Sequence, residues 1–154
     1  TLGKQDEPTS FITPEGDRVA PAICYESAFG GYMAEFIRKG AGAIFIITND
    51  GWWKNTPGYR QHFSFARLRA VESRRSVARS ANTGISGFIS QRGEVLQRSK
   101  WWVEDALTAQ INFNDKLTFY VKHGDYIARV SVFMAALTLL NLVVTLIKGK
   151  KNPH

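Results

Sequence analysis

The chain has 154 residues, of which 44% are hydrophobic and 21% charged, and this suits one modest domain with a sizeable core. Its net charge of +7 raises the question of nucleic acid, but the basic residues are dispersed and we find no nucleic-acid-binding motif. A single cysteine excludes an intramolecular disulfide, so the cysteine count does not identify the redox compartment.

The first residues are polar and rich in turn formers, and they include neither an initiator methionine nor a targeting segment. We therefore expect the chain to be the C-terminal part of a longer protein. Residues 11–13 are predicted to form a short edge strand, and Glu15-Gly-Asp17 a hairpin turn. The apolar run Arg18 to Ile23 predicts a buried strand that leads directly to the cysteine, Cys24.

Helical and strand patterns then alternate. Apolar residues recur at helical spacing from Phe29 to Ile37, and Gly40 is a plausible helix C-cap. The run Ala43 to Thr48 predicts a central strand buried on both faces, and a helix is expected from Tyr59 to about Arg75. Four further strands are predicted, followed by a linker over residues 115–126. These strands are Ser76–Ala81, Ile85–Ser90, Val95–Gln97 and Leu107–Ile111. The alternation indicates an α/β layered domain.

The segment Val130 to Ile147 is almost continuously apolar, with basic residues at both ends. Eighteen helical residues rise about 27 Å, close to the thickness of a bilayer's hydrocarbon core. This length predicts a transmembrane helix in preference to a buried core helix. Short basic clusters elsewhere then indicate contact with anionic lipid headgroups. They are Arg67/Arg69, Arg74/Arg75/Arg79 and the lysine tail.

Cys24 lies where a predicted strand ends and a helix begins. The free N–H groups and partial positive charge of a helix N-terminus favour a thiolate. The backbone N–H after the cysteine can also point at a developing oxyanion. A small buried hydrophobe is the alternative for a lone cysteine, but its surroundings favour a nucleophile.

Those surroundings contain four motifs in order. The first is Ala20-Pro-Ala-Ile-Cys-Tyr-Glu26, which holds the cysteine. It is followed by Thr48-Asn-Asp-Gly-Trp-Trp53, then Gln61-His62 with Ala66-Arg-Leu-Arg-Ala-Val-Glu72, then Arg79-Ser-Ala-Asn-Thr-Gly84. Together they resemble the nitrilase, or carbon–nitrogen hydrolase, superfamily, and more narrowly its bacterial apolipoprotein N-acyltransferases. The resemblance covers roughly residues 16 to 125, and a hydrophobic helix follows it as in that family.

The resemblance implies the second half of a nitrilase-like α-β-β-α sandwich over residues 1–126. A transmembrane helix over 127–148 and a basic cytoplasmic tail over 149–154 would follow. It also implies a cysteine, glutamate and lysine triad, with Cys24 as the nucleophile. The family's glutamate and lysine lie upstream, and neither Lys4 nor Glu7 has the required spacing, so we expect the isolated chain to be inactive.

Other residues are candidates for supporting roles. In the acyltransferases the two residues after the cysteine matter for function, and here they are Tyr25 and Glu26. Glu26 could instead be an acid that stabilises the first turn of a helix. Four residues of the loop after the predicted central strand are candidate substrate contacts, although turn formation and packing also explain them. They are Asn49, Asp50, Trp52 and Trp53.

Three further features have ordinary explanations. His62 is expected to be a locally hydrogen-bonded helix residue rather than a general base, and Arg69–Glu72 a solvated ion pair. Asn82 and Gly84 stand where superfamily members support the active-site loops. The three histidines do not have metal-ligand spacing, and no phosphate-binding loop is present, so we expect neither a metal nor a cofactor.

The implied activity is transfer of a fatty acyl group from a phospholipid to the N-terminal amine of a diacylglyceryl-cysteine lipoprotein, through a cysteine thioester. The implied partners are therefore the phospholipid donor, the lipoprotein acceptor and the membrane. The implied location is the bacterial inner membrane, with the catalytic domain on the periplasmic side. Two alternatives remain open: a nitrilase-type amidase acting on a small amide, and a membrane-tethered module without catalysis.

Overall fold

The computed structural model describes residues 7–151, and it divides the chain into two compact units with a boundary between Gly124 and Asp125. The first unit is built on one six-stranded sheet whose strands lie side by side in chain order. The strands are β1 (Phe11–Ile12), β2 (Arg18–Ile23), β3 (Ala43–Thr48), β4 (Ser76–Ala81), β5 (Gly87–Ile89) and β6 (Val95–Arg98). Strands β2, β3 and β4 are parallel, and the other pairs are antiparallel.

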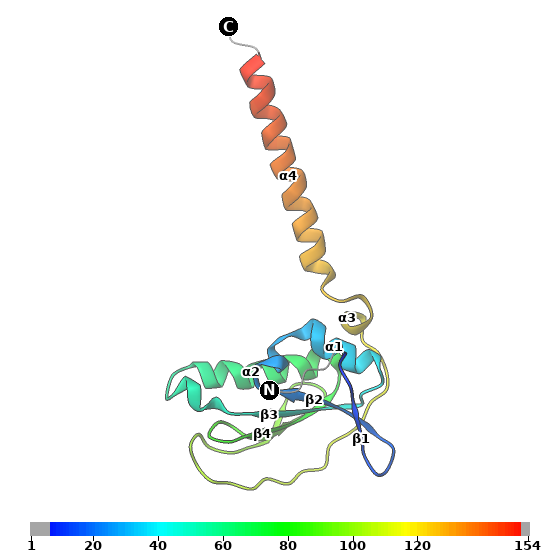
Figure 1. Ribbon diagram of the computed structural model, residues 1–154, viewed down its shortest axis with the longest axis vertical. Coiled ribbons are helices and arrows are strands. Elements are labelled where there is room, and N and C mark those ends of the chain that lie inside the picture. Colours follow the sequence, from blue (N-terminus) through cyan, green and yellow to red (C-terminus); the bar gives the residue numbers. More distant parts are fainter. Residues whose placement is uncertain (1–6, 152–154) are drawn as a thin grey trace. The chain divides into compact units, whose positions relative to one another are not determined.

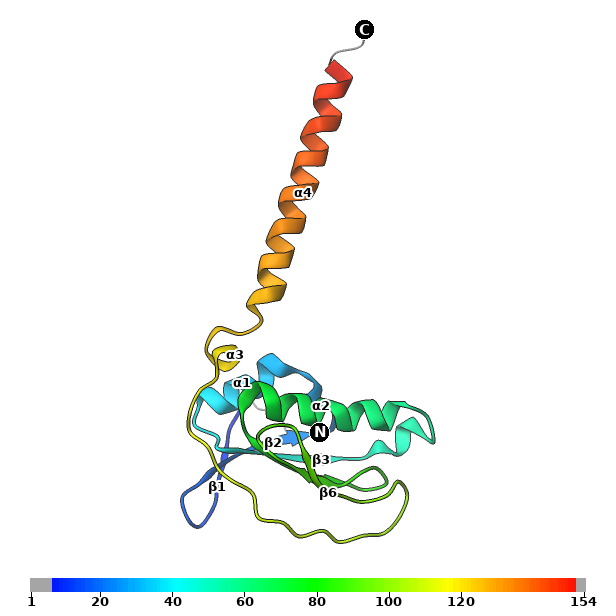
Figure 2. The ribbon, with the colours of Figure 1, turned by 180° about the vertical axis from the view of Figure 1, so that it is seen from behind.

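Two helices connect the three parallel strands. Helix α1 (Gly30–Arg38) joins β2 to β3, and helix α2 (Gly58–Ser73) joins β3 to β4. A short 3₁₀ turn precedes each helix: η1 (Cys24–Ala28) and η2 (Asp50–Trp53). Figures 1 and 2 show both helices on the same face of the sheet, as expected when successive crossovers have the same hand.

The hydrophobic core lies between this sheet face and the helices. Ile44 and Ile46 of β3 are fully buried and belong to one cluster with Phe36 of α1 and Phe63 of α2. Burying apolar surface stabilises the fold by about 25 cal/mol per Å². Because side chains alternate along a strand, β3 presents its other residues to the opposite face.

That opposite face corrects one prediction. Phe45 and Ile47 remain 38% and 64% exposed, so β3 is not buried on both faces in this structure. The helices cover one side only, and Figures 1 and 2 show the long connection from β6 to helix α3 (Phe119–His123) passing the other side. An apolar strand therefore borders a partly open surface.

The other element predictions are confirmed with three exceptions, of which the first is the helix expected directly after Cys24, where the turn η1 comes instead. The bounds of β2, β3 and β4 agree with prediction, and Gly40, at φ +97°, follows α1 in the left-handed conformation that glycine favours. The predicted strand Leu107–Ile111 is wrong, because this segment pairs with none of the six strands of the sheet. The next residue, Asn112, is held by a hydrogen bond from Ser76 Oγ to its carbonyl. The predicted linker also contains the short helix α3.

The second unit is helix α4 (Tyr126–Lys151). Its stretch Tyr126–Lys148 is long and apolar enough to cross a membrane, and it contains the predicted span Val130–Ile147. Of the predicted tail over 149–154, residues 152–154 lie outside the described residues, as does Lys4 at the other end.

Candidate active site

The candidate site lies at one edge of the sheet, where the parallel strands end. Cys24 follows β2 directly, Asn49 follows β3, and Asn82 follows β4. Loops at the carboxyl ends of parallel strands are the usual location of ligand sites in open α/β sheets. The topology therefore brings the motifs that begin at Thr48 and Arg79 to the same edge of the sheet as the motif that contains Cys24.

Cys24 has an unusual backbone. Its φ of 54° places a non-glycine residue in the left-handed region, where strain costs about 1–3 kcal/mol. The residue opens η1 and is half-buried, so the turn replaces the α-helix that was predicted to follow the cysteine at once. Its carbonyl accepts a 2.9 Å hydrogen bond from Ser27 Oγ. A strained turn at a strand end holds the only thiol of the chain at the sheet edge.

Tyr25 is the centre of an aromatic cluster beside the thiol. Its ring, in a residue that is 45% exposed, has its centroid 5.9 Å from that of Phe29, 6.3 Å from that of Phe65 and 6.4 Å from that of Trp53. The pairs with Phe29 and Phe65 are edge-to-face, and such pairs each contribute about 0.5–1.5 kcal/mol beyond area burial. The cluster forms an apolar wall next to Cys24.

Glu26 turns back toward the strand end. Its Oε2 accepts a 2.8 Å hydrogen bond from the backbone N–H of Ile23, the residue before the cysteine. Glu26 is thus the acid in the first turn of η1 and binds the N–H of the N-cap residue Ile23, which is the helix-terminus role that the sequence left open. A carboxylate acceptor makes such a bond roughly twice as strong as a neutral one.

Behind the nucleophile lies a buried charged cluster formed by Asp50, His62 and Arg79. They come from η2, α2 and β4, and their exposed fractions are 0%, 1% and 4%. Arg79 Nη2 donates to both Asp50 oxygens, at 3.0 and 2.8 Å. His62 Nδ1 lies 2.9 Å from Asp50 Oδ1, and its Nε2 lies 3.2 Å from the Cys24 carbonyl oxygen.

Burial and charge pairing have opposite effects on the pKa values of the groups in this cluster. Burial alone would raise the pKa of the Asp50 carboxyl, but hydrogen bonds from His62 and Arg79 together with their charge hold that pKa below its usual value. Burial lowers the pKa of the Arg79 guanidinium, and the negative charges of Asp50 and of a Cys24 thiolate oppose this shift.

Sequence reasoning missed the role of this cluster. His62 was expected to bond locally, whereas its partners are 12 and 38 residues away in the chain. Arg79 and Arg75 were assigned to a basic surface, yet both are buried, and Arg69 is buried in its pair with Glu72 rather than solvated. The available signal was position: Asp50 and Arg79 flank the ends of adjacent parallel strands, and His62 lies on the helix between them.

The remaining predicted residues divide into structural and exposed ones. Asn49 caps η2 by accepting from the Gly51 N–H at 3.1 Å, so it has the turn role that the sequence left open. Trp53 packs in the aromatic cluster, whereas Trp52 is 84% exposed. Gly84 lies against Asp50, because a Cβ at this glycine would stand 2.6 Å from the Asp50 Cβ. The supporting position expected for Gly84 therefore has a steric basis.

A basic recess of about 400 Å³ opens at the same edge of the sheet. Three cationic residues line it together with the stacked rings of Tyr59 and Trp101, whose centroids are 4.0 Å apart. The cationic residues are Arg60, Arg98 and Lys100. Ile85 also lines the recess, and its carbonyl accepts a hydrogen bond from Arg79 Nη1. The recess is thereby connected to the charged cluster behind the cysteine.

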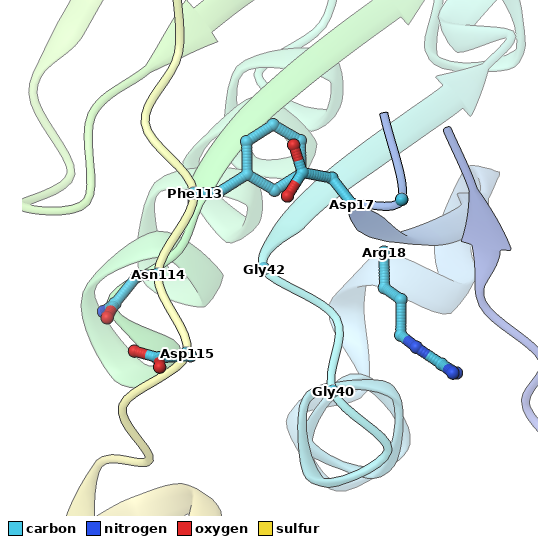
Figure 3. A pocket seen from close by; sticks show the side chains of 8 residues that line it. Asp17, Arg18, Gly40, Gly42, Phe113, Asn114 and Asp115 are labelled. Carbon is cyan, nitrogen blue, oxygen red and sulfur yellow. The ribbon is translucent and has the colours of Figure 1, made fainter. Parts of the chain in front are cut away.

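A second recess lies at the opposite edge. Figure 3 shows it between Arg18, where β2 begins, and the segment around Phe113. Because the amino ends of the parallel strands face this side, the recess is remote from Cys24. Within residues 7–151, no group of three histidine, cysteine or acidic side chains is placed to hold a metal ion.

Comparison with known proteins gives consistent relatives. The chain is 36% identical over 140 residues to an apolipoprotein N-acyltransferase from Chlorobaculum tepidum, an alignment covering 90% of this chain and 26% of that protein. It is 48% identical over 120 residues to one from Agrobacterium fabrum, covering 77% and 22%. The chain therefore spans about a quarter of the length of the curated relatives it matches.

Solved structures match the fold. Nit3 of Saccharomyces cerevisiae, a member of the nitrilase superfamily, aligns with a TM-score of 0.56 at 22% identity, covering 68% of this chain and 41% of Nit3. An amidase from Nesterenkonia sp. aligns with a TM-score of 0.51 at 17% identity, covering 64% and 39%. The mixed α/β sheet is thus the fold of the nitrilase superfamily. The family model for carbon-nitrogen hydrolases matches residues 1–116, and the chain belongs to that family.

Proposed function

We propose that this chain carries the nucleophile of an apolipoprotein N-acyltransferase and forms the C-terminal part of that enzyme. Support comes from relatives of that name and from the single thiol held half-buried on a strained turn. The helix α4, long and apolar enough to span a bilayer, suits an enzyme whose two substrates are both lipid-anchored. The observation that carries the proposal is the placement of Cys24 where β2 ends, on a left-handed turn beside the buried Asp50, His62 and Arg79.

The proposed reaction has two acyl transfers. The Cys24 thiolate attacks an ester carbonyl of a phospholipid, the C–S bond forms, and the ester C–O bond breaks to release a lysophospholipid that takes up a proton. The N-terminal amine of a diacylglyceryl-cysteine lipoprotein then attacks the thioester. The amide C–N bond forms, the amine gives up a proton, and the thiol is restored.

Particular residues have proposed parts in this reaction. Glu26, with its bond to the Ile23 N–H, supports the turn that holds the nucleophile. The rings of Tyr25 and Trp53 offer an apolar wall for an acyl chain, and exposed Trp52 can reach the lipid. The basic recess suits the phosphate of the donor, because its lining contains three cations and no acid. Asn49 and Asp50 support the loop rather than contact the substrate.

The rest of the machinery is proposed to come from segments beyond this chain. A glutamate base and a lysine are needed to move protons and stabilise the oxyanion, and such assistance contributes about 10²–10⁴-fold. The chain spans about a quarter of its relatives' length, which leaves room for both groups. The proposed location is the bacterial inner membrane, with the first unit on the periplasmic side and the lysine-rich end of α4 in the cytoplasm.

The test is acyl transfer by the intact protein from a labelled phospholipid to a diacylglyceryl lipopeptide. Cys24→Ala should abolish transfer without changing the melting temperature. Substantial transfer by this variant would refute the assignment. A nitrilase-type amidase is the second candidate, favoured by the fold of the Nesterenkonia enzyme. Release of ammonia from small amides without acyl transfer to the lipopeptide would support it instead.

A further inference from the structure

We propose that Asp50, His62 and Arg79 act as positioning residues that aim the backbone N–H of Tyr25 at the oxyanion formed when Cys24 attacks an acyl carbon. This rests on the proposed function only in taking Cys24 as the nucleophile. The three side chains are almost completely buried and come from three different elements, so they hold one another in fixed positions.

The first step is the direction of the His62 ring. Arg79 binds both oxygens of Asp50, and Asp50 Oδ1 is also hydrogen-bonded by Thr48 Oγ1, at 3.2 Å. The carboxylate is therefore fixed from two sides. Its Oδ1 lies 2.9 Å from His62 Nδ1, which sets the rotation of the ring and leaves Nε2 facing the turn that contains Cys24.

The second step is what Nε2 binds. It lies 3.2 Å from the Cys24 carbonyl oxygen and 3.4 Å from Ser27 Oγ. The hydroxyl of Ser27 donates its hydrogen to that same carbonyl, at 2.9 Å. Because the Cys24 carbonyl and the Asp50 carboxylate can both only accept, we assign a hydrogen to each ring nitrogen of His62. The Cys24 carbonyl thus accepts hydrogen bonds from Ser27 Oγ and from His62 Nε2, and His62 is held in place by Asp50.

The third step follows from the planarity of the peptide bond. The carbonyl of Cys24 and the N–H of Tyr25 belong to one trans peptide, so they point in opposite directions. When His62 and Ser27 hold the carbonyl toward the interior, the N–H must point away from them. Without these donors, the left-handed backbone of Cys24, which costs about 1–3 kcal/mol, could relax and rotate the peptide.

Because of this geometry, we expect acylation and alkylation of the Cys24 thiol to respond differently to the loss of His62. Acylation by an ester passes through a tetrahedral intermediate whose oxyanion needs an N–H donor. Alkylation by iodoacetamide displaces iodide and forms no oxyanion. Removing one oxyanion donor costs about 10²–10³-fold in acylation rate, whereas alkylation depends only on the population of the thiolate and on access to it, which change acylation to the same extent. A general loss of structure would change both rates.

The experiment uses the intact protein with its membrane helix in detergent micelles, acylated with p-nitrophenyl butyrate or alkylated with iodoacetamide at Cys24. His62→Leu should lower the acylation rate about 10²-fold and change alkylation less than threefold. His62→Gln, whose amide can still donate to the Cys24 carbonyl, should recover most of that loss. Gln61→Leu, on the exposed face of the same helix, is the matched control and should change neither rate.

Ser27→Ala is the second variant, since it removes the other donor with little loss of volume. We expect an intermediate, roughly tenfold, loss of acylation and unchanged alkylation. Thermal unfolding should remain cooperative in every variant compared. Equal changes in both rates, or full acylation by folded His62→Leu and Ser27→Ala, would overturn the inference. Ester acylation needs no phospholipid, so failure of the proposed acyl transfer alone leaves this result intact, whereas an inert wild-type Cys24 would refute both.

Discussion

At the scale of single residues, Cys24 depends on partners that lie far away in the chain. Its carbonyl is bound by His62, and the N–H of the preceding residue is bound by Glu26. The two bonds hold the turn from both sides of the thiol. Backbone strain at Cys24 is maintained because these contacts over-determine the local conformation.

Glu26 and Glu72 should respond differently to loss of charge. Glu26→Gln weakens the bond to the Ile23 N–H beside the nucleophile, so we expect acyl transfer to fall at least tenfold with little change in melting temperature. Glu72→Gln removes the charge that faces buried Arg69, 3.2 Å away, and should lower the melting temperature while activity remains. Equal losses of activity in both variants would return Glu26 to a purely structural role.

Asp50 predicts a pH dependence of stability. Its folded-state pKa lies below the ordinary value of 3.8, so the folded state binds this proton less readily than the unfolded state. The stabilisation is therefore fully present above that ordinary value and is lost as the pH falls through the lower, folded-state pKa. Urea unfolding between pH 2 and 7 should show this loss in the wild type. The loss should be smaller in Asp50→Asn, and an unchanged acid limb would contradict the account.

At the scale of elements, α2 connects most parts of the site. His62 faces the cysteine turn, Tyr59 lies one turn earlier beside the basic recess, and Arg67 Nε donates to the Gly93 carbonyl in the β5–β6 turn. One buried helix face therefore links nucleophile and recess. The helix was predictable from the sequence, but which of its residues face the cysteine turn, the recess and the β5–β6 turn depends on how the helix packs on the sheet.

The residues at the end of β6 lead to a prediction about the basic recess. Arg98 and Lys100 are two residues apart, and Ser99 between them is buried, with its Oγ accepting from the Ser86 N–H at 2.9 Å. Arg98→Gln with Lys100→Gln should weaken binding of the intact protein to a short-chain phosphatidylglycerol at least tenfold. Arg92→Gln, an exposed charge in the β5–β6 turn, should have little effect. If the double variant and Arg92→Gln weakened lipid binding equally, the result would indicate only a general attraction of the basic protein to negatively charged lipid.

How much the sequence predicted differs between elements. Strand β3 was predictable because it is an apolar run rich in β-branched residues, whereas β2 and β4 are more mixed and each contain an arginine. The segment Leu107–Ile111 has a strand-like pattern, but a strand requires a hydrogen-bonded neighbour, which the pattern cannot specify. Burial of Arg75 was hidden for a similar reason, since its partners are the carbonyls of Ala41, Ser73 and Lys116, which carry no sequence signature.

At the scale of the whole molecule, the chain combines a sheet-based unit with an apolar helix, and each unit is defined by its own contacts. The exposed apolar residues Phe45 and Ile47 border one open face of the sheet, and α4 is exposed along its apolar length. Both surfaces are of a kind that marks interaction sites. A membrane is the partner that we propose for α4.

The membrane prediction concerns the direction of α4. The stretch Tyr126–Lys148 should span the bilayer, with its lysine-rich end in the cytoplasm. A reporter that is active only in the cytoplasm should be active when it is fused after His154. β-Lactamase, which confers resistance only from the periplasm, should not confer resistance when it is fused at the same point. Extraction of the chain in detergent-free buffer, or a periplasmic reporter, would contradict the span or its direction.

The central claim, that Cys24 carries the acyl group, has one direct measurement. The intact protein is incubated with a phospholipid bearing a defined acyl chain, without acceptor, and the peptide containing Cys24 is analysed by mass spectrometry. We expect a mass increase equal to that acyl chain, removal of the modification by neutral hydroxylamine, and its loss on addition of a diacylglyceryl lipopeptide. Transfer of the acyl chain to the lipopeptide while Cys24 stays unmodified under every condition would contradict the account.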